Sequence, residues 1–263
     1  MPLGNLKKQG RLLVGDNVEL KKDEFSDNYV ITKVFGRFNE IIRPKVTNID
    51  QILIVISAVP KPDLYLVDKL IVNAHINNIS PVLVINKIDL IGKEELDEYV
   101  TMYENVVDSI VLTSAVNNNV QTLKEVLKNK TSVFAGQSAV GKSSLINCIS
   151  PNLNQATNIL SKKVERGKHT TRECTIFVLD DNIMIADTPG FSMLELDVKY
   201  NELKDYYPEF EDAKCRYNNC THTTETGCVI KSKVNAGEIN KSRYDRYLEI
   251  FKQLKTKWER EYD

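Results

Sequence analysis

Between about residue 50 and residue 190 the chain alternates between short apolar runs and longer amphipathic segments. The runs have the length and β-branched content of strands, which predicts strands at Ile52–Ser57, Pro81–Ile85, Ser109–Leu112, Ser132–Ala135, Thr175–Leu179 and Ile183–Ala186. The segments between most of them have apolar residues at helical spacing and predict helices over Leu64–Asn77, Glu94–Tyr103, Val120–Leu127 and Lys142–Ile149. Strands that are apolar along their whole length indicate an α/β fold with a mostly parallel sheet covered on both faces.

Two features refine this picture of the central region. The last two strands are joined by the turn residues Asp180-Asp181-Asn182, so we expect one of them to be an antiparallel edge strand. Ligands bind a mostly parallel sheet at the carboxyl ends of its strands. We therefore expect functional residues directly after the predicted strands.

The two flanking regions have different patterns. Strand-like runs at Leu12–Leu20 and Tyr29–Val34, with turn residues at Gly15-Asp16 and Ser26-Asp27-Asn28, predict a small β module near the N-terminus. Apolar and aromatic residues on one face of Lys241–Trp258 predict a helix that packs on its own module. These changes in pattern divide the chain into three parts, which we place at residues 1–45, 46–192 and 193–263.

Composition limits the class of protein. A chain of 263 residues with 42% hydrophobic residues and a net charge of −1 can bury a substantial core and is not typical of disordered proteins. No apolar run reaches the roughly 18 residues of a membrane span, and the first residues lack the apolar stretch of a signal peptide. Five cysteines, an odd number, argue against a disulfide scaffold. We expect a soluble, cytoplasmic protein without a membrane partner.

The small net charge hides an uneven distribution. Lysine and arginine outnumber acids by nine to six in residues 1–45, by five to two in residues 161–175 and by eight to three in residues 231–257. Such segments can hold a polyanion on one face while the molecule stays soluble. Solvated surface charge is the alternative interpretation.

A phosphate-binding pattern follows one of the predicted strands. Gly136-Gln137-Ser138-Ala139-Val140-Gly141-Lys142-Ser143 matches G-x-x-x-x-G-K-[ST], and Ser144 follows in the predicted helix. The glycines permit a close approach of the backbone, whose N–H groups and helix N-terminus then face the phosphates. Lys142 supplies a positive charge to the outer phosphates, and the Ser143 hydroxyl is a ligand for Mg²⁺.

A second phosphate-side motif lies at the end of the strand Ile183–Ala186. In Asp187-Thr188-Pro189-Gly190, the carboxylate of Asp187 can hold Mg²⁺ through its water shell, and the Gly190 N–H can approach the γ-phosphate. The motif is common by chance, but its position after a buried strand and downstream of the phosphate loop makes it informative.

Two base-reading motifs follow consecutive predicted strands. In Asn86-Lys87-Ile88-Asp89, the Asp89 carboxylate can accept hydrogen bonds from guanine N1–H and its amino group, the Lys87 stem can pack on the base, and Asn86 can fix the loop. A site built on such hydrogen bonds rejects adenine strongly. Ser114 and Ala115 can present backbone N–H groups to the guanine carbonyl oxygen. Together with the phosphate loop, these motifs predict GTP as the ligand, with GDP as its product.

The order of the motifs is unusual for a guanine-nucleotide protein. The base-reading motifs, at residues 86 and 114, precede the phosphate loop at residue 136, whereas most such proteins have the phosphate loop first. A circularly permuted chain can build the same sheet, because neighbours in space need not be neighbours in sequence.

A cluster of metal-binding residue types lies further along the chain. Cys215-x4-Cys220-x-His222-x5-Cys228 supplies three thiolates and one imidazole, a complete tetrahedral shell for one structural Zn²⁺. The remaining cysteines, Cys148 and Cys174, are expected to be small core residues.

With these motifs, the chain resembles the circularly permuted, ribosome-small-subunit-dependent GTPases of bacteria over residues 11–263. The resemblance depends on the permuted order, the Cys/His cluster and the run Gly167-Lys168-His169-Thr170-Thr171-Arg172. It implies an N-terminal OB-fold-like module, a permuted GTPase domain and a C-terminal zinc-binding, mainly helical module. The stretch Val14–Glu19 is similar to the second part of the OB fold, so we expect that module to be incomplete.

The resemblance also implies a partner. Members of that family bind the immature small ribosomal subunit, act late in its maturation and hydrolyse GTP faster when bound. We therefore predict a GTPase that binds the small subunit through its rRNA and works as a monomer. The alternative is a regulatory GTP-binding switch with a protein partner. An ATP-dependent phosphotransferase is a third possibility, which competition between GTP and ATP would exclude.

The residue that orients the attacking water is not set by the motifs alone. Phe191 follows the second phosphate-side motif, where many GTPases place a glutamine for this task. His169 is the candidate, and the family pattern likewise implies a catalytic histidine there; a surface histidine or a contact to RNA phosphate is the alternative. We prefer Thr171 to Thr170 as a further Mg²⁺ ligand.

Overall fold

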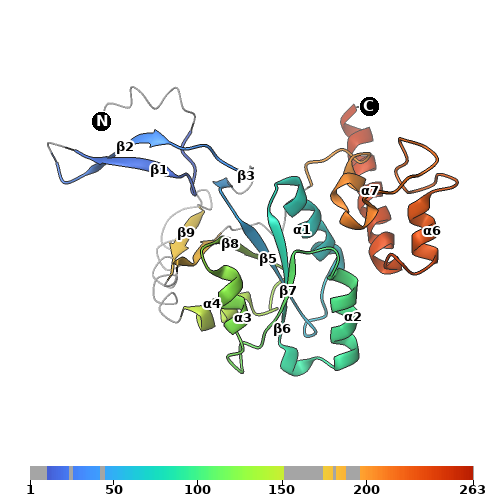
Figure 1. The fold of residues 1–263 in the computed structure, drawn as a ribbon, viewed down its shortest axis with the longest axis horizontal. Coiled ribbons are helices and arrows are strands. Elements are labelled where there is room, and N and C mark those ends of the chain that lie inside the picture. Colours follow the sequence, from blue (N-terminus) through green and yellow to red (C-terminus); the bar gives the residue numbers. More distant parts are fainter. Residues whose placement is uncertain are drawn as a thin grey trace.

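A six-stranded sheet lies at the centre of the computed structural model, which describes residues 11–23, 26–41, 45–150, 174–179, 182–187 and 196–262 (Figure 1). Its strands are β5 (Gln51–Ser57), β6 (Ser80–Asn86), β7 (Ser109–Leu112), β8 (Thr131–Ala135), β9 (Thr175–Val178) and β10 (Met184–Asp187). They are ordered β7-β6-β5-β8-β10-β9. All neighbours pair in parallel except β10 and β9, which confirms the predicted mixed sheet with an antiparallel edge strand.

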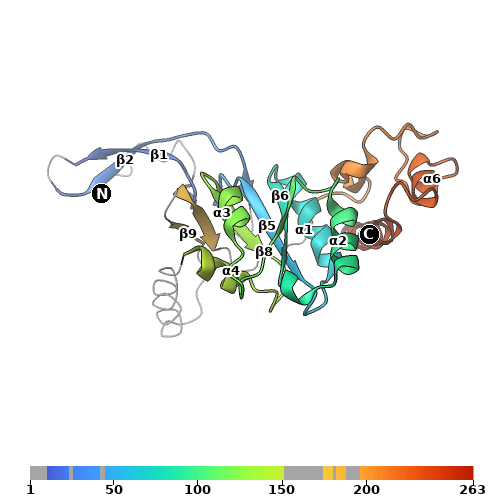
Figure 2. The same ribbon diagram turned by 60° about the horizontal axis from the view of Figure 1, so that its bottom comes forward.

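Helices cover both faces of the sheet (Figure 2). Apolar residues alternate in β5: Ile52, Ile54 and Ile56 pack in one cluster with α1 (Leu64–Ile76) and α2 (Lys93–Tyr103). Leu53 and Val55 point the other way and pack with α3 (Gln121–Leu127) and α4 (Lys142–Ile149). Because both faces are buried, the central strands must be apolar along their whole length, as their sequences are.

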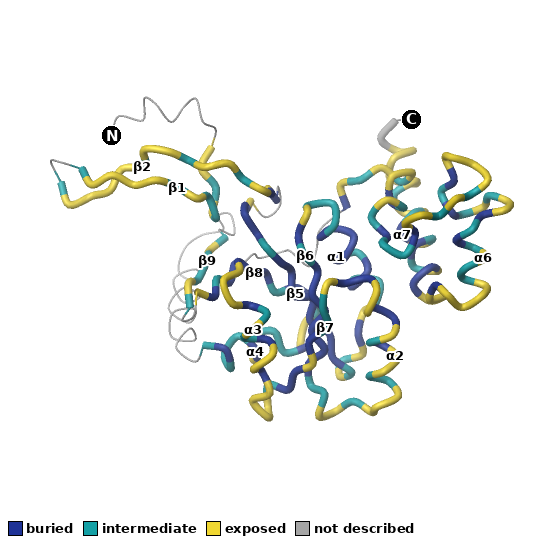
Figure 3. Tube along the Cα trace, viewed as in Figure 1, coloured by how far each residue is buried: buried dark blue, intermediate teal, exposed yellow. Residues whose placement is uncertain are grey.

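The N-terminal part carries two small antiparallel sheets, within the residues described. One pairs β1 (Val18–Lys22) with β2 (Tyr29–Val34), and the other pairs β3 (Glu40–Ile41) with β4 (Val46–Thr47). The β1–β2 ribbon extends from the body, and most of its residues are exposed (Figure 3).

One predicted strand in this part begins later than expected. Residues 12–17 are not in a regular strand; only Val14 makes an isolated bridge, to Val46. Gly15 has φ +95°, and a Cβ added there would lie 2.1 Å from the carbonyl oxygen of Thr47. This close approach turns the chain, so that β1 starts only at Val18.

The C-terminal part is mainly helical, with short 3-10 turns at Leu203–Tyr206 and Pro208–Phe210, then α6 (Val229–Asn235) and α7 (Lys241–Tyr262). We call residues 196–262 the C-terminal module. Of the predicted stripe on α7, Tyr244 and Tyr247 are buried in the core of this module, whereas Trp258 is 38% exposed. None of the described helices is long and apolar enough to cross a membrane. The expected domain boundary at residue 192 lies outside the described residues, and the boundaries stay predictions.

Candidate functional site

The loop between β8 and α4 has the backbone that phosphate binding requires. Gly136 has φ +126°, and a Cβ there would lie 2.3 Å from the carbonyl oxygen of Val55 on the neighbouring strand. Any side chain at this position would push β8 away from β5. The loop then enters α4 at Gly141, so that the N-terminus of this helix opens onto the carboxyl edge of the sheet.

Asn86, at the end of β6, holds this loop in place. A Cβ on Gly141 would lie 2.3 Å from Asn86 Nδ2, and the same nitrogen donates a hydrogen bond to the carbonyl oxygen of Val140 (2.9 Å). Asn86 is 1% exposed and accepts a further bond from the Thr113 hydroxyl (3.2 Å). The first base-reading motif and the phosphate loop are therefore in direct contact, although Asn86 and Val140 are 54 positions apart in sequence.

Lys142 lies inside the phosphate loop. Its ammonium donates to the carbonyl oxygens of Gly136 (2.7 Å) and Gln137 (2.6 Å), and burial lowers its pKa. The other side chains of the loop differ in exposure: those of Ser138, Ala139, Ser143 and Ser144 are exposed, and that of Val140 is buried. A cation and exposed serine hydroxyls therefore lie on the same loop, a combination of groups that can receive an anion.

The remaining base-reading residues gather beside the phosphate loop. Lys87 donates from Nζ to the carbonyl oxygen of Ala139 (2.8 Å), which stretches its stem along the edge of the loop. The Asp89 carboxylate accepts a short hydrogen bond from the Ser114 hydroxyl, and Ser114 also accepts from the Asn117 N–H (3.3 Å). Asp89 is exposed and Ser114 is buried, so a rigid residue orients a solvent-facing carboxylate.

Two contacts in this region carried no signal in the sequence patterns. Cys148 packs against the core as expected, but it also donates from its thiol to the carbonyl oxygen of Ala115 (3.4 Å). The Gln137 side chain bridges to the loop before α1, where Gln137 Oε1 accepts from the Asp63 N–H (2.6 Å). Neither residue type marks such a role, because both contacts join segments far apart in sequence.

Three predicted site residues, His169, Thr171 and Gly190, lie outside the described residues. Asp187 is the last residue of β10, where its backbone pairs with Thr175 at the antiparallel edge.

The four predicted zinc ligands meet in the C-terminal module. Their ligand atoms, the sulfurs of Cys215, Cys220 and Cys228 and a ring nitrogen of His222, all lie within 4.8 Å of one another. Cys215 Sγ is 4.0 Å from Cys228 Sγ, and His222 Nδ1 is 3.6 Å and 3.4 Å from these two sulfurs. A tetrahedral zinc shell requires edges of about 3.6 to 3.8 Å. The residues present therefore fit Zn²⁺.

The surroundings of the cluster suit a structural metal. Burial lowers the pKa of His222, which favours the neutral imidazole that binds metals, whereas burial raises the pKa of the Cys220 thiol to about 12. A nearby cation that binds thiolate would reverse the latter effect. The backbone of the cluster is fixed from α7, because the Tyr244 hydroxyl donates to the His222 carbonyl oxygen (2.6 Å) and that of Tyr247 to the Thr221 carbonyl oxygen.

Comparisons with known proteins agree with this arrangement. The family model described as RsgA GTPase matches residues 34–197, more than half of the chain. Proteins named small ribosomal subunit biogenesis GTPase RsgA are similar: the one from Caldanaerobacter subterraneus subsp. tengcongensis is 41% identical over 95% of this chain and 86% of its own length. The one from Alkaliphilus metalliredigens is 42% identical over 95% and 87%.

Solved structures give the same result. YjeQ from Thermotoga maritima superposes with a TM-score of 0.83 at 37% identity, covering 95% of this chain and 87% of its own. The structure titled YloQ, a circularly permuted GTPase, gives 0.79 at 32% identity, covering 97% and 85%. In the present chain, too, the strand that carries the base-reading residues precedes the strand that leads into the phosphate loop. The chain belongs to the RsgA family of circularly permuted GTPases.

Proposed function

We propose that this GTPase acts on the small ribosomal subunit during its biogenesis, hydrolysing GTP to GDP and phosphate with turnover that rRNA stimulates. The names of its relatives support the partner. One observation carries the assignment of the GTP site: Asn86 and Lys87 bind the carbonyl groups of Val140 and Ala139. Base-reading and phosphate-binding residues thereby form one continuous surface at the carboxyl edge of the sheet, where such folds bind ligands.

In this proposal the phosphate loop, residues 136–144, binds the phosphates through its backbone N–H groups, and Lys142 turns from its carbonyl partners toward them. Asp89, held by Ser114, reads the guanine edge. Ser143, Thr171 and Asp187 are the proposed Mg²⁺ ligands, and the ion, when bound, neutralises charge on the phosphate oxygens. His169 is the proposed residue that orients the attacking water. Gly190 is proposed to approach the γ-phosphate.

The C-terminal module offers a surface for RNA phosphates. The far half of α7 projects exposed cationic side chains, among them Lys252, Lys255 and Arg260. A shallow hollow along this helix is lined by Lys252 and Arg260 together with Thr256. Among the described residues, Glu249 is the one acid that borders it. A positive, hydroxyl-bearing surface of this kind suits a phosphate backbone. The zinc ion, held by Cys215, Cys220, His222 and Cys228, would stabilise the module that presents it.

The test is GTP hydrolysis by the full, zinc-loaded chain with and without purified small ribosomal subunits, with large subunits as the control. We expect small subunits to accelerate turnover and large subunits to leave it unchanged. The acceleration should weaken steeply as salt increases, because phosphate contacts release counterions. Turnover that responds to neither subunit, together with tight binding to a protein from the same cells, would instead support the regulatory switch.

A further inference from the structure

Helix α1 has two buried faces. Val67, Leu70, Ile71 and Ala74 pack against the sheet in the cluster that includes β5 and β6. Tyr65, Val72 and Ile76 lie on the other side and pack into the core of the C-terminal module, together with Tyr247 and Ile250 of α7. The same helix therefore belongs to the GTPase domain and forms the surface on which the C-terminal module docks.

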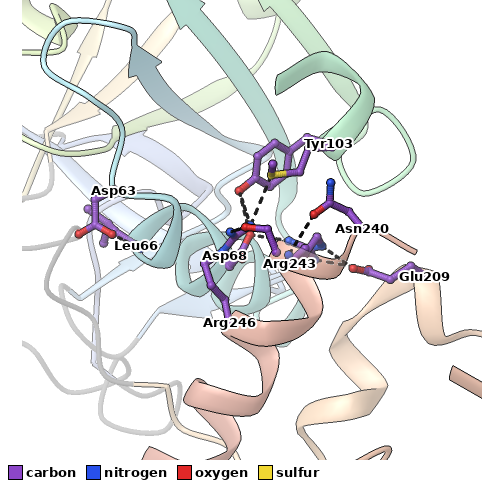
Figure 4. Close-up of polar contacts among 10 residues, drawn as sticks. Asp63, Leu66, Asp68, Tyr103, Glu209, Asn240, Arg243 and Arg246 are labelled. Carbon is purple, nitrogen blue, oxygen red and sulfur yellow. Dashed lines mark hydrogen bonds and ion pairs between the residues drawn. The ribbon is translucent and has the colours of Figure 1, made fainter. Parts of the chain in front are cut away.

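A buried group of charges holds the C-terminal module on α1 (Figure 4). Asp68 of α1 has no exposed side-chain surface, and Arg243 of α7 is 1% exposed. Asp68 Oδ1 accepts from Arg243 Nη1 (2.6 Å) and from the Tyr103 hydroxyl (3.0 Å), while Oδ2 accepts from Arg246 Nε. Arg243 also donates to Glu209 of the C-terminal module. Two cations thus meet two anions, and removing one member would leave a buried charge without its partner.

The other end of α1 is attached to the nucleotide site. Gln137 Nε2 donates to the carbonyl oxygen of Lys61 (2.9 Å), and Gln137 Oε1 accepts from the Asp63 N–H (2.6 Å). Asp63 is the N-cap of α1, and its carboxylate accepts from the Leu66 N–H (3.0 Å). Lys87 donates to the carbonyl oxygen of Val59 in the same loop (2.6 Å). Side chains from two nucleotide motifs therefore hold the loop that begins α1.

We propose that docking of the C-terminal module on α1 and binding of the nucleotide strengthen each other. Two positioning residues connect these events: Asp68, where the module docks on α1, and Gln137, in the phosphate loop. Asp63 and Asp68 are five residues apart, about 7.5 Å along a helix. A displacement of α1 at Asp68 is therefore transmitted to the N-cap Asp63, whose N–H is bound to Gln137. This inference rests on the proposed nucleotide site.

The direction of the effect follows from preorganisation. Phosphates gain most from N–H groups that already point at them, and a loop that must first be ordered binds more weakly. A docked C-terminal module holds α1 in place. Helix α1 in turn holds the loop before it and, through Gln137, the phosphate loop. Coupling between two binding equilibria is reciprocal, so the bound nucleotide must hold the module more firmly by the same factor.

The test is a double-mutant cycle on the full, zinc-loaded chain, with the dissociation constant of a fluorescent GDP analogue as the readout. Gln137→Ala and Asp68→Asn should each raise this constant about fivefold or more. The double variant should have about the same dissociation constant as the single variant that binds the GDP analogue less tightly, because both substitutions break the same link. Zinc content and far-ultraviolet circular dichroism must equal those of the wild type.

A milder variant and a matched control complete the experiment. Tyr65→Phe removes the hydrogen bond from the Tyr65 hydroxyl to Gln253 Oε1 of α7 (2.6 Å) and should raise the constant to a smaller degree. It replaces Asp68→Asn in the cycle should that variant fail to fold. Tyr99→Phe is the matched control: it also removes one tyrosine hydroxyl hydrogen bond, to Glu95 Oε1 within α2 (3.0 Å) and outside the proposed link, so GDP should bind as in the wild type.

Three results would overturn the inference. The first is wild-type GDP affinity in folded Asp68→Asn and Tyr65→Phe. The second is an effect of Tyr99→Phe as large as that of Tyr65→Phe, and the third is purely additive effects of Gln137→Ala and Asp68→Asn in the cycle. A wild-type chain that binds no guanine nucleotide would refute the proposed nucleotide site itself, which keeps the two failures distinct.

Discussion

Asp89→Asn tests the guanine site with almost no change in side-chain shape. The carboxylate lies exposed in the 3-10 turn Ile88–Leu90, and the buried Ser114 hydroxyl donates to its Oδ1. A carboxylate accepts about four hydrogen bonds, so Asp89 keeps acceptor sites for the two donors of a guanine edge. An asparagine keeps the oxygen that Ser114 contacts but replaces the other oxygen with an amino group.

The expected loss of affinity can be worked out from these contacts. A hydrogen bond to a charged group contributes about 1.5 to 3 kcal/mol, and guanine makes two of them to Asp89. The variant loses the charge and sets an amino donor against a guanine donor. We expect a cost of about 3 to 6 kcal/mol, which weakens GDP binding roughly 150-fold to 25,000-fold. Xanthine has a carbonyl oxygen where guanine has its amino group, so xanthosine diphosphate should bind the variant better than GDP does.

The assay is competition of GDP, xanthosine diphosphate and ADP against a fluorescent GDP analogue. Asp97→Asn is the matched control, because Asp97 is an exposed acid on α2 and its substitution makes the same change in charge. The control should keep wild-type affinities for all three nucleotides. If Asp89→Asn retains wild-type affinity for GDP, this carboxylate does not read the base, and the assignment of guanine specificity to this motif is wrong.

Three further predictions concern other parts of the chain. His169→Ala should lower subunit-stimulated GTP turnover at least tenfold while GTP affinity stays within about twofold, and unchanged turnover would remove His169 from the mechanism. The chain should hold one zinc ion by elemental analysis; Cys228→Ala should lose it and melt at a lower temperature, whereas a chelator should lower the melting temperature of the wild type only. Hydrogen bonds from Arg37 hold the pKa of Asp16 below its usual 3.8, so this pair stabilises the fold above pH 3.8, and the effect is lost as pH falls through the lower pKa of the folded state. Asp16→Asn should therefore lower the free energy of opening, measured by hydrogen exchange in β1 and β2, by about 2 kcal/mol at pH 7. A decrease of the same size at pH 2 would refute the charge-based explanation.

The sequence predicted best the elements whose patterns are local. The strand Ser109–Leu112 and the helix Lys142–Ile149 have the predicted bounds. Both are set by apolar periodicity within a few residues and by clear boundaries, such as Gly141 before the helix. The strand expected at Leu12–Leu20 failed because its course depends on the backbone of Thr47, more than 30 residues away.

The candidate site divides in the same way. Motifs such as Gly136–Ser144 and the zinc ligands depend on residue types at fixed spacing, which a sequence displays directly. Asp68 is a different case, because it lies in a helical pattern whose apolar positions gave no hint that an acid would be buried among them. Its partner Arg243 is 175 residues away. Only the path of the chain in space brings such charges together.

The late position of α7 affects how the chain is completed during synthesis. The segment from β5 to β7 can form its layer with α1 and α2 as soon as it leaves the ribosome, since domains generally fold from the N-terminal side. At that stage Tyr103 is available to bond Asp68 but Arg243 is not, so the Asp68 carboxylate stays hydrated on the side of α1 that carries Tyr65 and Val72. Its charge should keep this otherwise apolar surface soluble in the nascent chain until α7 is made and Arg243 pairs with Asp68.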